Sequence, residues 1–248
     1  MNIFSHNYIF GVATCSKKPN GSLKLDQLLG TAFSIGNQFF VTANHVAESS
    51  KSSSLKGLIY YDQSDRASLF PIKDIEEFPD YDFAILEVPD IPHSHFNWNF
   101  NNLVMLDDVR SCGFPFAFDI TNKVIRTRAF KGHVVSSGPH FRLPSHPPCY
   151  ELSFQCPRGL SGAPLMTKDE SSQSLLVKGI ILGNNSTEMN IYTEKEIIKG
   201  TDGNIEKTYE RFQAMELGVA LNIDSIKDLN SRILKGTLYN YFNSLLQK

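Results

Sequence analysis

The segment Gly159-Leu160-Ser161-Gly162-Ala163-Pro164-Leu165 decides how the rest of this 248-residue chain is interpreted. It is a turn of small residues that places one hydroxyl between glycines. A serine hydroxyl is a poor nucleophile at neutral pH and needs a base to take its proton. Glycines beside it let backbone N–H groups turn toward a developing oxyanion. Because Gly-x-Ser-Gly alone more often marks a tight turn, the other parts must come from the surrounding sequence.

Two motifs upstream supply those parts. The segment Val41-Thr42-Ala43-Asn44-His45-Val46 follows an apolar run, and Asp82-Phe83-Ala84-Ile85-Leu86-Glu87-Val88 begins another. Histidine suits proton transfer because its pKa lies near neutrality, and a carboxylate holds the imidazole in one tautomer. Singly, each residue has a structural interpretation. Together, in this order and each at a strand boundary, they predict Ser161 as nucleophile, His45 as general base and Asp82 as the orienting residue.

Short apolar runs separated by turn residues dominate the chain as far as Ile223. Gly36-Asn37 lies between two of these runs and is a hairpin signal. Many short strands with turns between them predict an all-β sandwich or barrel architecture. The expected strands are Thr31–Ile35, Gln38–Thr42, Leu58–Tyr61, Phe83–Val88, Val124–Thr127, Gly132–Ser136, Tyr150–Phe154, Leu175–Leu182 and Leu217–Ile223.

The three motifs resemble Thr-Ala-x-His, Asp-x-Ala-x-Leu and Gly-x-Ser-Gly-x-Pro of the trypsin-like, or chymotrypsin-fold, serine peptidases. The order His, Asp, Ser also matches that fold, and the compact spacing resembles bacterial HtrA-like domains. Similar matches surround the motifs at Gly30-Thr31-Ala32-Phe33, Val177–Ile181 and Gly218–Leu221.

The resemblance implies two antiparallel β-barrels followed by C-terminal helices, in one peptidase domain over residues 1–248. The expected parts are a first barrel at 8–115, a second at 116–223 and a helical segment at 224–248. The catalytic crevice would lie between the barrels. The backbone N–H groups of Gly159 and Ser161 would form the oxyanion hole.

The resemblance also implies where substrate binds. Six residues would line or rim the specificity pocket, namely Gln155, Cys156, Arg158, Leu182, Gly183 and Asn184. Because Gln155 rather than a carboxylate would form its base, we expect a neutral side chain before the cleaved bond. An acidic one paired with Arg158 is the less favoured alternative. Leu160 stands where tryptic zymogens carry an Asp, so activation by N-terminal cleavage is not expected.

Two regions depart from the strand pattern. From Asp224 onward, Ile226, Leu229 and Ile233 recur at helical spacing, which predicts a helix as far as Gly236. A second apolar stripe follows over 238–246 and is expected to dock on the barrel rather than bind a partner. The polar stretch Asn184–Arg211 is interpreted as a long loop, which in a β-domain is usually functional or mobile.

Composition limits the partners and the compartment. The formal net charge is −2, which offers no basic field for nucleic acid or anionic membrane. No apolar run is long enough to cross a bilayer, and the N-terminus lacks the features of a secretory signal. Four cysteines without a CxxC pair predict buried free thiols and a cytoplasmic location. No His, Asp or Glu cluster has metal-ligand spacing, so neither metal nor cofactor is expected.

These features predict a serine endopeptidase that cleaves intracellular proteins through an acyl-enzyme, with a protein partner as activator. By analogy, its role is in bacterial defence or stress. The alternative is a catalytically silent, peptidase-fold binding module that acts through its C-terminal helices. Hydrolysis of a non-peptide ester is a third option, although the fold favours an extended peptide in the crevice.

Overall fold

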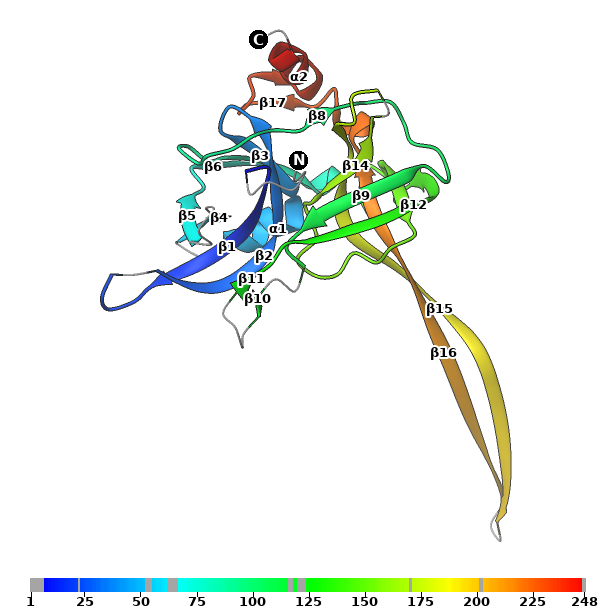
Figure 1. The fold of residues 1–248 in the computed structure, drawn as a ribbon. Coiled ribbons are helices and arrows are strands. Elements are labelled where there is room, and N and C mark those ends of the chain that lie inside the picture. The colour runs from blue at the N-terminus through cyan, green and yellow to red at the C-terminus, as the bar shows by residue number, and fades with distance from the viewer. Residues whose placement is uncertain are drawn as a thin grey trace.

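The computed structural model describes residues 7–21, 23–51, 55–61, 67–115, 118–119, 124–169, 171–200 and 203–246. Its strands gather into two large sheets that lie side by side (Figure 1). The expected all-β architecture with two barrel-like units is therefore confirmed. Antiparallel pairing dominates both sheets, and short connections join several of the neighbouring strands, such as β1 to β2 and β2 to β3.

The first sheet is a curled half-barrel with the strand order β5-β4-β1-β2-β3-β7-β6. Its side chains Phe10, Phe33, Phe40 and Phe83 are fully buried and form the centre of its core. The predicted turn at Gly36-Asn37 joins β2 to β3, and both residues have positive φ angles. The elements of this unit are β1 (Ile9–Lys17), β2 (Leu23–Gly36), β3 (Phe39–Ala43), α1 (Asn44–Ser50), β4 (Lys56–Tyr61), β5 (Ala67–Pro71), β6 (Asp74–Phe78), the 3-10 helix η1 (Pro79–Tyr81) and β7 (Phe83–Glu87).

The second sheet closes into a barrel, because β15 pairs with β14 as well as with β16. Along β13, Tyr150 and Leu152 point into this barrel, whereas Cys149 joins the core cluster of the first unit. The outer face of the second barrel thus packs against the first. The strands of this sheet are β8 (Asn97–Trp98), β9 (Asp108–Gly113), β12 (Arg128–Pro139), β13 (Pro148–Leu152), β14 (Pro164–Lys168), β15 (Leu175–Gly200) and β16 (Gly203–Asn222). Between β9 and β12, β10 (Phe118–Asp119) and β11 (Val124–Ile125) form a separate two-stranded sheet.

The stretch expected as a long loop is instead a two-stranded β-arm. Strands β15 and β16 remain paired from the barrel to Gly200 opposite Gly203, and the arm projects away from both barrels (Figure 1). Its polar composition hid the strands, because strand prediction from sequence relies on apolar alternation, which this stretch lacks.

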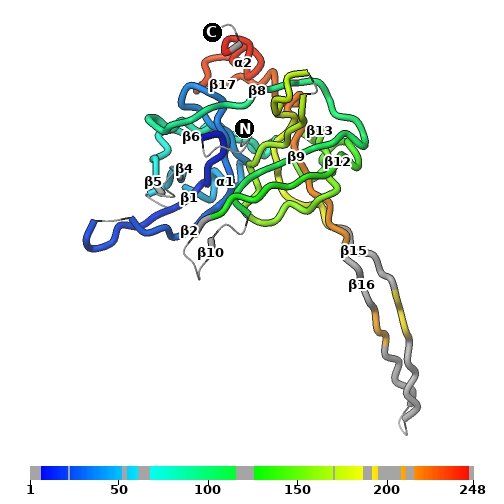
Figure 2. Tube along the Cα trace, viewed as in Figure 1, coloured from blue at the N-terminus to red at the C-terminus, as the bar shows by residue number. Residues whose placement is uncertain are grey.

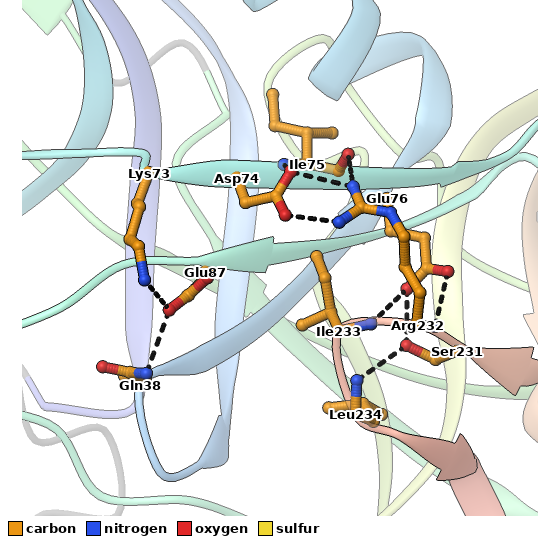
Figure 3. A network of polar contacts seen from close by, with 10 residues as sticks. All are labelled: Gln38, Lys73, Asp74, Ile75, Glu76, Glu87, Ser231, Arg232, Ile233 and Leu234. Atoms are coloured by element: carbon orange, nitrogen blue, oxygen red, sulfur yellow. Dashed lines mark hydrogen bonds and ion pairs between the residues drawn. The ribbon is translucent and has the colours of Figure 1, made fainter.

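The stretch expected as a helix from Asp224 to Gly236 also folds differently. It forms the 3-10 helix η2 (Ile223–Ile226) and a small ladder of β17 (Asn230–Ser231) and β18 (Gly236–Thr237). Contacts with β6 explain the break, as Figure 3 shows. Glu76 accepts hydrogen bonds from Ser231 Oγ and from the backbone N–H of Arg232, at 2.5 and 2.8 Å. These bonds require an irregular backbone here.

The final helix, α2 (Leu238–Leu246), matches the second predicted stripe. It lies beside β8 and β17 at one end of the molecule (Figure 2). The rings of Trp98 and Phe242 stack with centroids 4.2 Å apart, and the Tyr241 hydroxyl donates to the Gly36 carbonyl at 2.8 Å. The stripe therefore docks on the body of the protein, against β8 and the end of β2. Within the described ranges, no helix combines the length and apolar character needed to cross a bilayer.

Candidate active site

His45 lies in the first turn of α1, which begins directly after the buried end of β3. Thr42 and Ala43 are buried at the end of that strand, and Thr42 Oγ1 donates to the Thr31 carbonyl at 2.7 Å. This anchoring fixes where the chain leaves the sheet. The backbone then turns into the helix and presents the His45 side chain at the surface, where it is 49% exposed.

Asp82 holds His45 through three contacts. Its carboxylate accepts from the His45 backbone N–H at 2.9 Å and lies 2.8 and 3.1 Å from His45 Nδ1. Asp82 has φ 49° between η1 and β7, a left-handed conformation that Asp tolerates better than most residues. With Nδ1–H donating to the carboxylate, Nε2 is the imidazole nitrogen left to act as a base.

Ser161 lies in a turn whose backbone needs glycine both before and after the serine. Gly159 and Gly162 have φ angles of +99° and +85°. A Cβ atom added at Gly162 would lie 2.1 Å from the Thr31 carbonyl oxygen, and one at Gly159 would lie 2.6 Å from the Phe114 carbonyl oxygen. The turn is also tied to the first unit, since Thr31 N–H donates to the Ser161 carbonyl at 2.9 Å.

One cavity brings the predicted nucleophile and base together. It has a volume of about 390 Å³, and His45, Gly159 and Ser161 line it together with Arg158. The Ser161 hydroxyl, however, donates to the Leu182 carbonyl at 2.9 Å. Among the described residues it makes no hydrogen bond to His45. The His45–Asp82 contact is therefore formed, while the serine hydroxyl is directed to the Leu182 carbonyl.

The predicted oxyanion donors are free in this arrangement. Within the described part of the chain, neither the Gly159 nor the Ser161 backbone N–H donates a hydrogen bond. Thr31, absent from the predicted site, positions this turn from the neighbouring strand. Its buried hydroxyl donates to the Gly159 carbonyl at 2.8 Å and accepts from the Phe114 N–H at 3.1 Å. In the sequence, the resemblance of Gly30-Thr31-Ala32-Phe33 to the peptidase family is the one signal for Thr31, and it does not indicate what the hydroxyl does.

The six residues predicted for substrate binding lie in two segments that meet beside Ser161. The Cys156 backbone N–H donates to Asn184 Oδ1 at 2.6 Å, and the Leu182 carbonyl reaches Ser161. Gln155 and Arg158 are exposed, whereas Cys156 is buried and is the member of its segment that packs inward. A Cβ added at Gly183 would meet nothing within 4 Å, so the space in front of it is open.

The four cysteines are free and buried. Burial raises the pKa of the thiols of Cys112, Cys149 and Cys156 to about 12. Thiols of this kind stay protonated at neutral pH, so none of these three competes with Ser161 as a nucleophile.

Solved structures similar to this fold are serine proteases. The sequence itself matches no protein-family model and no curated protein. The active form of the Rv3671c protease from M. tuberculosis is 19% identical, with 89% of this chain and 78% of that chain covered at a TM-score of 0.51. The MamO protease domain from Magnetospirillum magneticum is 14% identical, with coverages of 87% and 92% and a TM-score of 0.54.

The HtrA-type protease AlgW with a decapeptide is 13% identical, with 98% of this chain and 65% of that chain covered at a TM-score of 0.55. At these identities the likeness establishes the fold alone. The chain has the trypsin-like serine protease fold, with HtrA-type domains among its structural neighbours.

Proposed function

We propose that this protein is a serine endopeptidase in which Ser161 attacks, His45 takes and returns the proton, and Asp82 orients His45. The observation that carries the proposal is the Asp82–His45 pair, with Nδ1 2.8 Å from the carboxylate, beside the cavity that His45 and Ser161 line together. An arrangement of this kind has the parts that acyl transfer requires.

The reaction would begin when the Ser161 hydroxyl leaves the Leu182 carbonyl and turns to His45 Nε2. His45 then removes the proton as Oγ attacks the peptide carbonyl, and Asp82 stabilises the resulting imidazolium. The free N–H groups of Gly159 and Ser161 would hold the oxyanion. His45 returns the proton to the leaving amine, and water hydrolyses the acyl-Ser161 ester by the same route.

The proposal extends to regulation and location. The serine's bond to Leu182 describes a resting state, and we propose that substrate or an activating protein partner releases it. Leu160 is fully buried, which supports activation without a new N-terminal amine. The buried free thiols support a reducing compartment, the cytoplasm, with intracellular proteins as substrates. A role in bacterial defence or stress is part of the same proposal and rests on analogy.

The second candidate is a peptidase-fold binding module without catalysis. The Ser161–Leu182 hydrogen bond favours it, because a serine held away from the histidine is not activated. Against it, His45 contacts Asp82 and shares a cavity with Ser161, and the proposed oxyanion donors make no hydrogen bond within the described residues.

Labelling with a fluorophosphonate probe separates the two candidates. We expect the wild-type protein to be labelled, Ser161→Ala to lose all labelling, and His45→Ala to label at least about a hundredfold more slowly. Ser172→Ala removes a hydroxyl from an exposed turn and is the matched control that should label normally. Labelling that survives Ser161→Ala would refute the assignment, and a wild type that stays unlabelled with substrate peptide present would favour the binding module.

A further inference from the structure

A second cavity, of about 450 Å³, lies on the outer face of the second barrel. The end of β12 and the loop that follows it cover strands β13, β16 and β15 there. Its lining includes Glu151 and Val219 from the sheet, Asn185 from β15, and His140, Phe141 and Arg142 from the loop.

This cavity adjoins the catalytic groups on two sides. The loop is anchored to η1, the element directly before Asp82, because Ser145 Oγ donates to the Asp80 carbonyl at 2.5 Å. On the other side, β15 passes Ser161 at Leu182 and reaches the cavity three residues later at Asn185. A substrate held at Ser161 can therefore extend into the cavity.

The edge of β15 between these points is open. Strand β14 pairs with β15 only as far as Ile180, and Ile181 makes the last bond, to the Ala163 carbonyl. In the described structure, no strand pairs with Leu182–Asn185 on the side away from β16. An extended peptide can add there as an antiparallel strand.

The register of such a strand places one substrate side chain at the cavity. With the residue before the cleaved bond beside Leu182, the fourth residue before that bond lies opposite Asn185. Side chains two apart on a strand share a face, so Asn185 shares its face with Gly183. Gly183 pairs with Val219, which in turn pairs with Glu151, so this face is the one that carries the cavity.

Glu151 is the one carboxylate among the described residues that line the cavity, and Arg142 is the lining residue of opposite charge. Glu151 accepts from Ser136 Oγ at 2.5 Å and from Asn185 Nδ2 at 3.0 Å, and these bonds lower the pKa of its carboxyl group. Among the described residues, no Lys or Arg forms an ion pair with it. His140 faces the same space, but burial and the nearby Arg142 lower the pKa of its imidazole by more than Asp82 and Glu151 raise it. His140 is thus no permanent cation for Glu151.

We infer that this cavity is a specificity site for a Lys or Arg side chain four residues before the cleaved bond. This inference rests on the proposed function for the direction in which substrate lies. Glu151 supplies the counter-charge, while the exposed ring of Phe141 can cover the aliphatic stem of the same side chain. Arg142 also lines the cavity but is exposed, so solvent screens its repulsion of a basic side chain.

Peptide binding to Ser161→Ala tests the inference without requiring catalysis. The probes are N-acetylated peptides that differ only at the fourth residue before a fixed neutral residue, with Lys, Arg, Met or Glu there. We expect Lys and Arg peptides to bind about 10–100-fold more tightly than the Met peptide, the range for a hydrogen bond to a charged partner. Adding Glu151→Gln should reduce this ratio to below about threefold, and adding Glu210→Gln, on the exposed arm, should not.

The outcomes separate this inference from the proposed function. Equal affinity for the four peptides, no measurable binding of any, or a preference for Glu directed by Arg142 would overturn the inference, even if the wild type cleaves peptides. A Lys preference that depends on Glu151, in a protein that fluorophosphonate does not label, would support the cavity as a binding site and refute the peptidase proposal.

Discussion

Thr31 offers the sharpest test of how the catalytic turn is held, because its one hydroxyl joins two backbone groups. It donates to the Gly159 carbonyl and accepts from the Phe114 N–H, and the residue is fully buried. Thr31→Val keeps the shape and removes both hydrogen bonds. Each orphaned buried group costs about 1–3 kcal/mol, so the free energy of unfolding should fall by about 2–6 kcal/mol. That is a large share of the stability of a typical domain.

The same substitution should slow chemistry at Ser161. Gly159 would lose the bond that fixes its carbonyl, and its N–H would no longer be held for the oxyanion. We expect fluorophosphonate labelling to slow by roughly tenfold or more, since losing one oxyanion donor costs about 10²–10³ in rate.

Thr31→Ser is the matched control. It retains the hydroxyl and loses one buried methyl group, which costs about 1 kcal/mol. Stability is measured by urea unfolding, and labelling is measured at temperatures where both variants are folded. A Thr31→Val protein within about 0.5 kcal/mol of the wild type, or less perturbed than Thr31→Ser, would refute this account of the turn.

Three further predictions concern stability. Gly162→Ala should destabilise the fold by about 3 kcal/mol or more, because it adds left-handed backbone strain and a clash with the adjacent strand. The control is Gly138→Ala, whose added Cβ meets nothing within 4 Å and should be tolerated in the same urea unfolding assay. Asn44→Ala should raise stability by about 1 kcal/mol, because the buried Asn44 Oδ1 has no hydrogen-bond partner among the residues that the structure describes. Asn99→Ala should lower stability, because Asn99 Oδ1 accepts a hydrogen bond from Lys178 Nζ at 2.7 Å. In thermal unfolding, an Asn44→Ala midpoint below that of Asn99→Ala would contradict both expectations. Three thiols have a folded-state pKa of about 12, above the ordinary cysteine pKa of 9.0. The free energy of unfolding is therefore highest below pH 9 and falls as pH rises toward 12, because the unfolded chain loses these protons first. Between pH 9 and 10 the slope should approach about 4 kcal/mol per pH unit for three thiols. A triple Cys→Ala variant that keeps the full slope would exclude these residues as its source: Cys112, Cys149 and Cys156.

The sequence predicted the parts of the fold that local chemistry determines. His45, Asp82 and Ser161 stand at strand boundaries in short motifs, and the turn at Gly36-Asn37 needs residues that accept positive φ. The structure places the histidine and aspartate in contact and brings the serine into the same cavity. Whether these three residues catalyse is the prediction that the labelling experiment addresses.

The parts that the sequence missed depend on contacts between distant segments. The stretch after Asp224 has helical spacing, but Glu76 of β6 takes its backbone N–H groups and holds it in an irregular form. Glu151 alternates with the buried Tyr150 and Leu152 as any outward strand residue does. Only the three-dimensional structure places its carboxylate in a cavity beside Asn185.

Trapping the acyl-enzyme tests the central claim most directly. Wild-type protein is mixed with an excess of an activated ester of a short neutral peptide, quenched in acid within the first turnover and analysed by mass spectrometry. The account predicts a burst of released alcohol and a mass increase equal to the peptide acyl group, located on Ser161 and missing from Ser161→Ala. Turnover without such an adduct, or an adduct on another residue, would contradict the claim that Ser161 is the nucleophile.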